Sequence, residues 1–230
     1  MRQATILIIS LLCLQLSYSQ IHEIGIYAGG SNLITDIGST KYINPDNLAL
    51  GLIYKLNMSP RHSWRLSVIY ADIDAYDSKS EDPRRIQRDY SFDSNLLEIS
   101  GGMEFTFIDF DLHSGLPMVT PYLYSGISAF RYDEYYYFAG NQTSANKKSW
   151  SFGIPMTLGI KTNILGSFVI GVEVGARYTF TDALDGSNPD DAALKQYRFG
   201  NINNNDWYMF SGITLTYTFG ENPCYCERSK

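Results

Sequence analysis

The chain has 230 residues, of which 44% are hydrophobic, 18% charged and 14% aromatic, and its formal net charge is −6. This length suits one domain or at most two small ones, and the acidic balance provides no basic patch for phosphates, so we expect no nucleic-acid partner. Tyrosine is as abundant as lysine and arginine together, with 18 of each, and the charged fraction lies below the roughly 25% of an ordinary soluble domain.

The first residues are typical of a secretory signal peptide, which we place at residues 1–19. Met1 and Arg2 precede an apolar run from Ile6 to Leu16, and small residues stand just before Gln20. The run is too short for a membrane-spanning helix, which needs about 20 apolar residues. Its removal leaves a mature chain from residue 20.

Strict alternation of apolar with small or polar residues recurs along the mature chain. Because side chains on a strand point to opposite faces in turn, this period of two predicts β-strands. The clearest case runs from Trp150 to Lys161, where large apolar residues alternate with Ser, Gly, Pro and Thr. The predicted strands cover residues 22–30, 48–57, 64–71, 97–107, 119–132, 150–161, 168–180 and 207–219.

The connections between these strands alternate in length. Links 58–63, 109–118 and 163–167 are short, whereas 31–47, 75–95, 133–149 and 181–206 are long and polar. Short turns at one end and long loops at the other are typical of outer-membrane barrels. We therefore expect an all-β fold, an eight-stranded antiparallel up-and-down transmembrane β-barrel over residues 20–219. The short turns and both termini would face the periplasm, and residues 220–230 would form a periplasmic tail.

A secreted β-sandwich is the alternative, since it also alternates apolar with polar residues. Three features favour the barrel. The strands match the roughly 9 to 11 residues that cross a bilayer. Aromatic residues at the strand ends form a candidate girdle against lipid, namely Trp64, Trp150, Phe168, Phe180, Trp207, Tyr217 and Phe219. The opposite face carries charges that must point into the lumen as candidate ion pairs, namely Lys55, Arg65, Glu98, Glu104, Lys161, Glu173 and Arg177.

These features predict a filled barrel rather than a pore or an enzyme. An eight-stranded barrel has an interior that side chains just fill. The histidines His22, His62 and His113 all fall on the predicted periplasmic side, away from any carboxylate at the outer rim, and no GxSxG or HExxH motif occurs. We expect no catalytic residue, no metal site and no cofactor, with outer-membrane lipid as the surroundings.

The tail contains the sequence Cys224-Tyr225-Cys226. Disulfides persist in an oxidising periplasm, but a bridge between residues i and i+2 has unfavourable geometry. The alternatives are an internal bridge, half of a metal site, or a bond to another protein. Our hypothesis is that Cys224 or Cys226 tethers a periplasmic partner.

An ordered series of segments spans nearly the whole mature chain, and the segments are Glu23 to Ile26 with Gly29 to Asn32 and Asp36, Gly51 to Lys55 with Ser59 to His62, Arg88 to Phe92, Leu97 to Ile99 with Glu104 and Phe105, Pro121 to Leu123 with Gly126, Pro155 to Lys161, and Arg177 to Asp182 with Leu184 and Asp185. Together these segments resemble the PorG family, small outer-membrane barrels of the type IX secretion system.

The resemblance implies a non-enzymatic role, in which the barrel anchors or contacts a periplasmic ring of the PorK and PorN type, formed by a lipoprotein and its soluble partner. The short turns and the tail would make that contact, with Arg61, His62, Asp109 and Asp111 as candidate polar groups. The alternative is an adhesin-like or ligand-binding barrel that acts through its long extracellular loops.

Overall fold

A computed structural model describes residues 21–112, 114, 116–201 and 203–220. The predicted signal peptide and both tail cysteines, Cys224 and Cys226, lie outside the described residues. The strands are β1 (Ile21–Ile34), β2 (Asn47–Ser59), β3 (His62–Tyr76), β4 (Ser91–Thr106), β5 (Val119–Phe138), β6 (Asn141–Leu165), β7 (Phe168–Thr179) and β8 (Trp207–Phe219).

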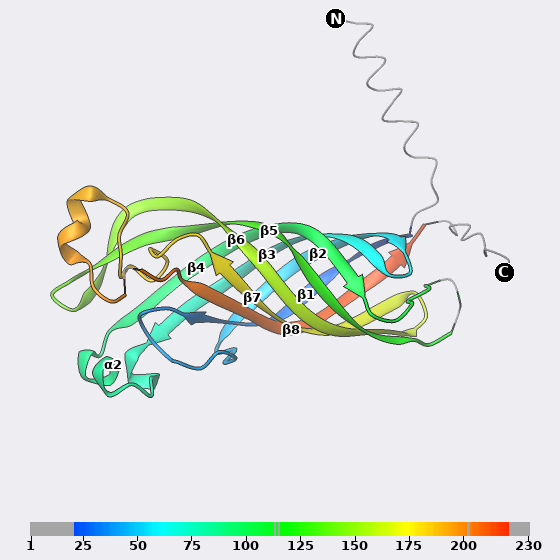
Figure 1. Cartoon of the computed structure of the whole chain (residues 1–230), viewed down its shortest axis with the longest axis horizontal. Coiled ribbons are helices and arrows are strands. Elements are labelled where there is room, and N and C mark those ends of the chain that lie inside the picture. Colours follow the sequence, from blue (N-terminus) through cyan, green and yellow to red (C-terminus); the bar gives the residue numbers. More distant parts are fainter. Residues whose placement is uncertain (1–20, 113, 115, 202, 221–230) are drawn as a thin grey trace, which may run out of the picture.

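The strands form one closed antiparallel barrel in chain order, from β1 to β8 (Figure 1). The closure is the pairing of β1 with β8, in which His22 lies opposite Phe219 and Ile34 opposite Trp207. The prediction of an all-β, eight-stranded, up-and-down antiparallel barrel is confirmed.

The barrel has two ends of different character. The turn end holds links 60–61, 107–118 and 166–167, together with the start of β1 and the end of β8. The loop end, on the left of Figure 1, holds links 35–46, 77–90, 139–140 and 180–206. Its short helices are η2 (Asp77–Lys79), α2 (Pro83–Arg88) and η3 (Ala192–Tyr197). None of the helices in the described residues is both long and apolar enough to cross a membrane.

Local sequence explains the helix at the loop end. The side chain of Asp82 accepts a hydrogen bond from the Arg84 amide at 2.9 Å, and Pro83 occupies the first helical position, where its missing N–H costs nothing. Asp77 is fully buried, and its carboxylate accepts from Arg88 Nε at 2.7 Å and from the Gly38 amide at 2.9 Å. This carboxylate therefore joins two loops that are far apart in sequence.

Residues 133–149, which the sequence predicts as a long loop, form a hairpin instead. β5 continues to Phe138 and β6 begins at Asn141, so only Ala139 and Gly140 make the turn. Both turn residues have positive φ, 50° and 84°, as a two-residue type I′ hairpin turn requires. The loop prediction is wrong because polarity does not exclude a strand here: strands that project past the barrel wall can carry polar side chains on both faces.

The two faces of the barrel wall differ sharply. Large apolar side chains are exposed on the outside, including Leu52 at 64%, Leu158 at 60% and Ile127 at 69%. In the described strands, the outward-facing charged side chains all lie toward the loop end, on strand segments beyond the apolar band, and they are Asp72, Asp74, Asp93, Arg131, Asp133 and Lys148. Between these charged residues and the turn end, the outer face of the described strands is a continuous band without charge.

Candidate functional site

The turn half of the barrel interior contains a cluster of buried ion pairs. Glu104 is fully buried and lies between two ammonium groups, with Lys55 Nζ at 2.8 Å from one carboxylate oxygen and Lys161 Nζ at 2.7 Å from the other. One layer away, Arg65 donates two hydrogen bonds to Glu173, at 2.7 and 2.8 Å. Such paired geometry offsets the desolvation of each charge, which an isolated buried ion would not survive.

A further layer, centred on Glu98, continues the cluster toward the loop end. Arg177 Nε donates to Glu98 at 3.2 Å, and the Tyr208 hydroxyl donates to the same carboxylate at 2.6 Å. The Tyr122 hydroxyl likewise donates a hydrogen bond to Glu173, also at 2.6 Å. All seven predicted lumen charges therefore lie inside the barrel, and each contacts an opposite charge.

Sequence reasoning missed an eighth interior charge, Glu23. It is fully buried and accepts hydrogen bonds from Asn57 Nδ2 at 2.9 Å and Thr216 Oγ1 at 2.7 Å. Within this cluster of described residues, Glu23, Glu98, Glu104 and Glu173 match four cations, Lys55, Arg65, Lys161 and Arg177. The signal was present in the chain, because Glu23 alternates with outward-facing Ile24 and shares the inner face of β1 with Tyr27.

The loop half of the interior holds a large apolar cluster, which the sequence did not predict. Ile37, Phe92 and Leu184 are fully buried there and pack in one cluster with the inner face of the strands. Leu184 comes from link 180–206, which the sequence predicts as a long polar loop and which instead folds into the barrel mouth. At the turn end, the side chain of Phe110 is buried beneath Lys161, whose Nζ lies 4.8 Å from the ring centre. Side chains from the links thus close the described interior at both ends.

The same link carries buried carboxylates. Asp185 is fully buried and accepts from the backbone amides of Asp36 at 3.0 Å and Ser187 at 2.8 Å. Burial raises its pKa, and burial with Asp185 and Asp182 nearby raises the pKa of Asp206. Burial also raises the pKa of Asp182 to about 6. Among the described residues, no group of three or more His, Cys, Asp or Glu side chains is arranged to hold a metal ion.

The turn end brings together part of the predicted contact set. Arg61 Nε donates to Asp109 in an exposed ion pair that joins link 60–61 to link 107–118. His62 packs against Phe105 with ring centres 5.2 Å apart and ring planes at 59°, so it belongs to the edge of the wall rather than to the pair. Asp111 is half-buried in link 107–118. Phe107 and Ile108, which precede Asp109 in the chain, and Leu116 of the same link expose half or more of their surface.

The predicted girdle residues divide between the two ends. Trp64, Phe168, Tyr217 and Phe219 lie toward the turn end, and Phe168 and Tyr217 pack with ring centres 5.3 Å apart. Trp150, Phe180 and Trp207 lie toward the loop end, where Tyr178 packs between the last two. All face outward; Trp207 is half-buried and the others are exposed.

A closed eight-stranded antiparallel barrel with an apolar outer wall and an ion-paired interior defines the class of this protein. The chain belongs to the DUF6089 family, whose model, described as a domain of unknown function, matches residues 2–228. That description assigns no function, so membership of the PorG family stays a prediction. No curated protein matches this chain in sequence.

Several solved structures resemble the barrel. Ail, the attachment invasion locus protein of Yersinia pestis, solved with the heparin analogue sucrose octasulfate, has 12% identity and a TM-score of 0.46 over 87% of this chain and 99% of that chain. A major outer membrane protein of Thermus thermophilus has 13% identity and a TM-score of 0.47 over 88% and 100%. Neisserial surface protein A has 14% identity and a TM-score of 0.43 over 88% and 96%. Likeness this distant says nothing about the function of the chain.

Proposed function

We propose that the chain is an outer-membrane barrel whose turn end faces the periplasm. The observation that carries this proposal is the charge-free apolar band on the outer wall, bounded by aromatic residues toward both ends. A soluble barrel would gain nothing from exposing Leu52, Leu158 and Ile127, whereas hydrocarbon excludes charge and aromatic side chains favour its two interfaces. The paired His22 and Phe219 put both ends of the barrel domain on the turn side.

Within that membrane, we propose a non-enzymatic role as a component of the type IX secretion system. The turn end and the Cys-containing tail would anchor or contact a periplasmic ring lipoprotein of the PorK and PorN type. Two features support binding rather than catalysis. The buried charges of the interior are engaged with one another, and exposed Phe107 and Ile108 precede Asp109 of the exposed Arg61–Asp109 pair in the chain. A polar pair beside apolar side chains suits a protein contact.

The test is co-purification from the native membrane under non-reducing conditions. We expect the full chain to retain a periplasmic lipoprotein, and a variant lacking residues 223–230 to lose it. Arg61→Glu should weaken the contact by placing like charge beside Asp109, while Lys41→Glu at the loop end, also an exposed cation, should not. Full retention of the lipoprotein by both the tail deletion and Arg61→Glu would contradict the anchor role.

The cysteines have their own readout. If Cys224 or Cys226 tethers the partner, a non-reducing gel should show a heavier species that disappears on reduction and in the double Cys→Ser variant. A chain that migrates only as a monomer in both conditions would leave the anchor without a covalent link.

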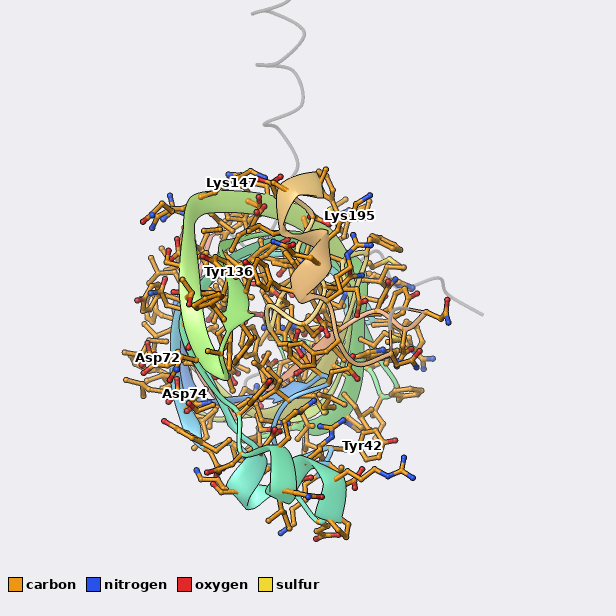
Figure 2. All side chains as sticks on the ribbon, turned by 90° about the vertical axis from the view of Figure 1, so that its left-hand side faces the viewer. Tyr42, Asp72, Asp74, Tyr136, Lys147 and Lys195 are labelled. Atoms are coloured by element: carbon orange, nitrogen blue, oxygen red, sulfur yellow. The ribbon has the colours of Figure 1, made fainter. Side chains whose placement is uncertain are left out.

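A second function is favoured by the projecting hairpin of β5 and β6. Near its tip, Phe138 is exposed, and both Phe138 and Tyr136 pack against Tyr197 of η3. Figure 2 places Tyr136, Lys147 and Lys195 on the same side of the loop end. A surface barrel could bind a ligand there. Removal of residues 136–143 would then abolish function while deletion of the tail left secretion unchanged.

A further inference from the structure

A pocket of about 520 Å³ lies on the outer side of the barrel at the loop end. It is bounded by the outward faces of β1, β7 and β8 and by links 35–46 and 180–206, with Arg85 of α2 at its edge. Tyr42, one of the lining residues, lies at the edge of the loop end in Figure 2, well away from Tyr136 of the β5–β6 hairpin. The volume is that of a small-molecule site, which typically measures about 300 to 1,000 Å³.

One wall of the pocket is apolar and continues the outer band. It is formed by Ile34, Ile43, Ala176, Trp207 and Met209. Ala176 and Met209 pair across β7 and β8, directly above the exposed apolar side chains of the same faces. An acyl chain that lies along β7 and β8 therefore reaches the pocket without passing a charged side chain of these strands.

The other wall is charged and predominantly acidic. Asp36, Asp182 and Asp206 line it together with Arg85. Two of these carboxylates already accept hydrogen bonds from backbone amides. Asp36 accepts from the Asn201 amide at 2.7 Å, and Asp206 accepts from the Leu184 amide at 2.9 Å.

The other two groups have neutral hydrogen-bond partners, and Arg198 and Arg88 act electrostatically on Asp182 and Asp36. Asp182 accepts from the Asn188 amide group at 2.8 Å, and Arg85 donates to the neutral Gly38 carbonyl at 3.1 Å. Three carboxyl groups and one guanidinium thus line the pocket, and burial together with the negative charge of neighbouring aspartates raises the pKa of Asp182 and of Asp206. An added cation would favour the ionised form of these carboxyl groups.

We propose that the pocket binds an aminophospholipid from the surrounding membrane. The ammonium group would lie against the three carboxylates, the phosphate beside Arg85, and the first carbons of one acyl chain on the wall of Ala176 and Met209. A zwitterionic head matches a site that has both signs of charge, whereas an anionic lipid would leave the carboxylates repelled. This inference rests on the proposed membrane location.

The test uses tryptophan quenching by lipids with brominated acyl chains. The chain has three tryptophans, so Trp64→Phe with Trp150→Phe leaves Trp207 as the reporter, and the two analogous double variants leave Trp64 or Trp150. Each is placed in nanodiscs of phosphatidylglycerol that contain a small, equal fraction of brominated phosphatidylethanolamine or brominated phosphatidylglycerol. We expect Trp207 to be quenched about threefold more strongly by the amine lipid, with equal quenching at Trp64 and Trp150.

Two variants locate the effect in the pocket. Ala176→Phe fills the apolar wall and should abolish the preference at Trp207, while Ala129→Phe, also half-buried on the outer wall but on β5, should preserve it. Asp182→Asn removes one carboxylate charge at nearly constant shape and should reduce the preference.

The outcomes separate this inference from the membrane location. Quenching at Trp64 and Trp150 with no preference at Trp207 would overturn the lipid site and leave the location intact. No quenching at any of the three reporters would overturn the location itself. A preference at Trp207 that survives Ala176→Phe would also overturn the site.

Discussion

At the scale of single residues, burial and pairing decide what the interior charges do. Glu104 pairs with two ammonium groups. Its removal therefore leaves Lys55 and Lys161 buried without their nearest carboxylate. An uncompensated buried charge costs far more than a surface pair gains, because the interior cannot replace water. The exposed Arg61–Asp109 pair follows the opposite rule and contributes little to stability.

We predict that Glu104→Gln lowers the free energy of unfolding by about 3 to 5 kcal/mol, as expected when one partner of a buried pair is removed. Guanidinium unfolding in lipid vesicles, followed by the slower gel migration of unfolded barrels, measures the change. Glu81→Gln is the matched control, since Glu81 is 74% exposed and lies 3.9 Å from Lys41. Equal stability of the two variants would contradict the role of the cluster.

The buried carboxylates of link 180–206 predict a pH dependence of that link. The pKa of Asp182 is about 6, against about 4 in an unfolded chain, so the folded link binds protons more readily than the open one. Protection of the link should therefore be greatest below about pH 4 and fall as pH rises through 6. Hydrogen exchange, corrected for intrinsic rates, measures this. Asp182→Asn should flatten the slope, whereas Asp190→Asn, at an exposed position, should leave it unchanged.

At the scale of elements, the strands are shaped by what their inner faces must accommodate. Small residues on one strand make room for large ones on the next. Gly159 on β6 is the clearest case, because an added Cβ there would lie 2.4 Å from the Tyr122 ring. Tyr122 fills that space on β5 and from it reaches Glu173 on β7. One glycine therefore positions a hydroxyl that links three consecutive strands.

We predict that Gly159→Ala destabilises the barrel by about 1 to 3 kcal/mol, since overpacking must displace the Tyr122 ring from Glu173. Gly101→Ala on the outer wall is the control, because its added Cβ meets only Leu66, at 3.9 Å. Thermal unfolding of both variants in the same vesicles makes the comparison. A loss in Gly101→Ala as large as that in Gly159→Ala would point to strand propensity rather than to Tyr122.

At the scale of the whole molecule, the turn half of the barrel has charges inside and apolar side chains outside, the reverse of a soluble protein. The loop half has an apolar interior cluster, as a soluble protein does. Ion pairs fill the turn half, and apolar side chains such as Phe92 and Leu184 fill the loop half, where links fold inward. Because the outer wall is apolar throughout its band, the surroundings rather than a core stabilise that surface.

The membrane location predicts the effect of one charge on the outer wall. Leu52→Arg, at a position 64% exposed near the middle of β2, should cost about 2 to 4 kcal/mol of folding free energy in lipid vesicles. Leu116→Arg, at a position 66% exposed in link 107–118, should cost little. If both variants fold into vesicles as well as the unaltered chain, the apolar band does not contact hydrocarbon.

The sequence by itself determined the wall segments of the eight strands, their order and the two faces of the wall, because alternation with period two is a local consequence of strand geometry. It also marked the seven charged residues that the structure brings together, since charge on an alternating strand identifies the inner face. Glu23 carried the same signal on a strand whose pattern was weaker.

Only the tertiary structure decided what depends on residues far apart in the chain. Local polarity could not show that Leu184 and Asp185 fold into the barrel mouth, or that residues 133–149 form a projecting hairpin. It could not pair Arg65 with Glu173 or assemble the lateral pocket from three strands, two links and a helix. The physical reason is closure, because the register that joins β1 to β8 sets which side chains share a layer.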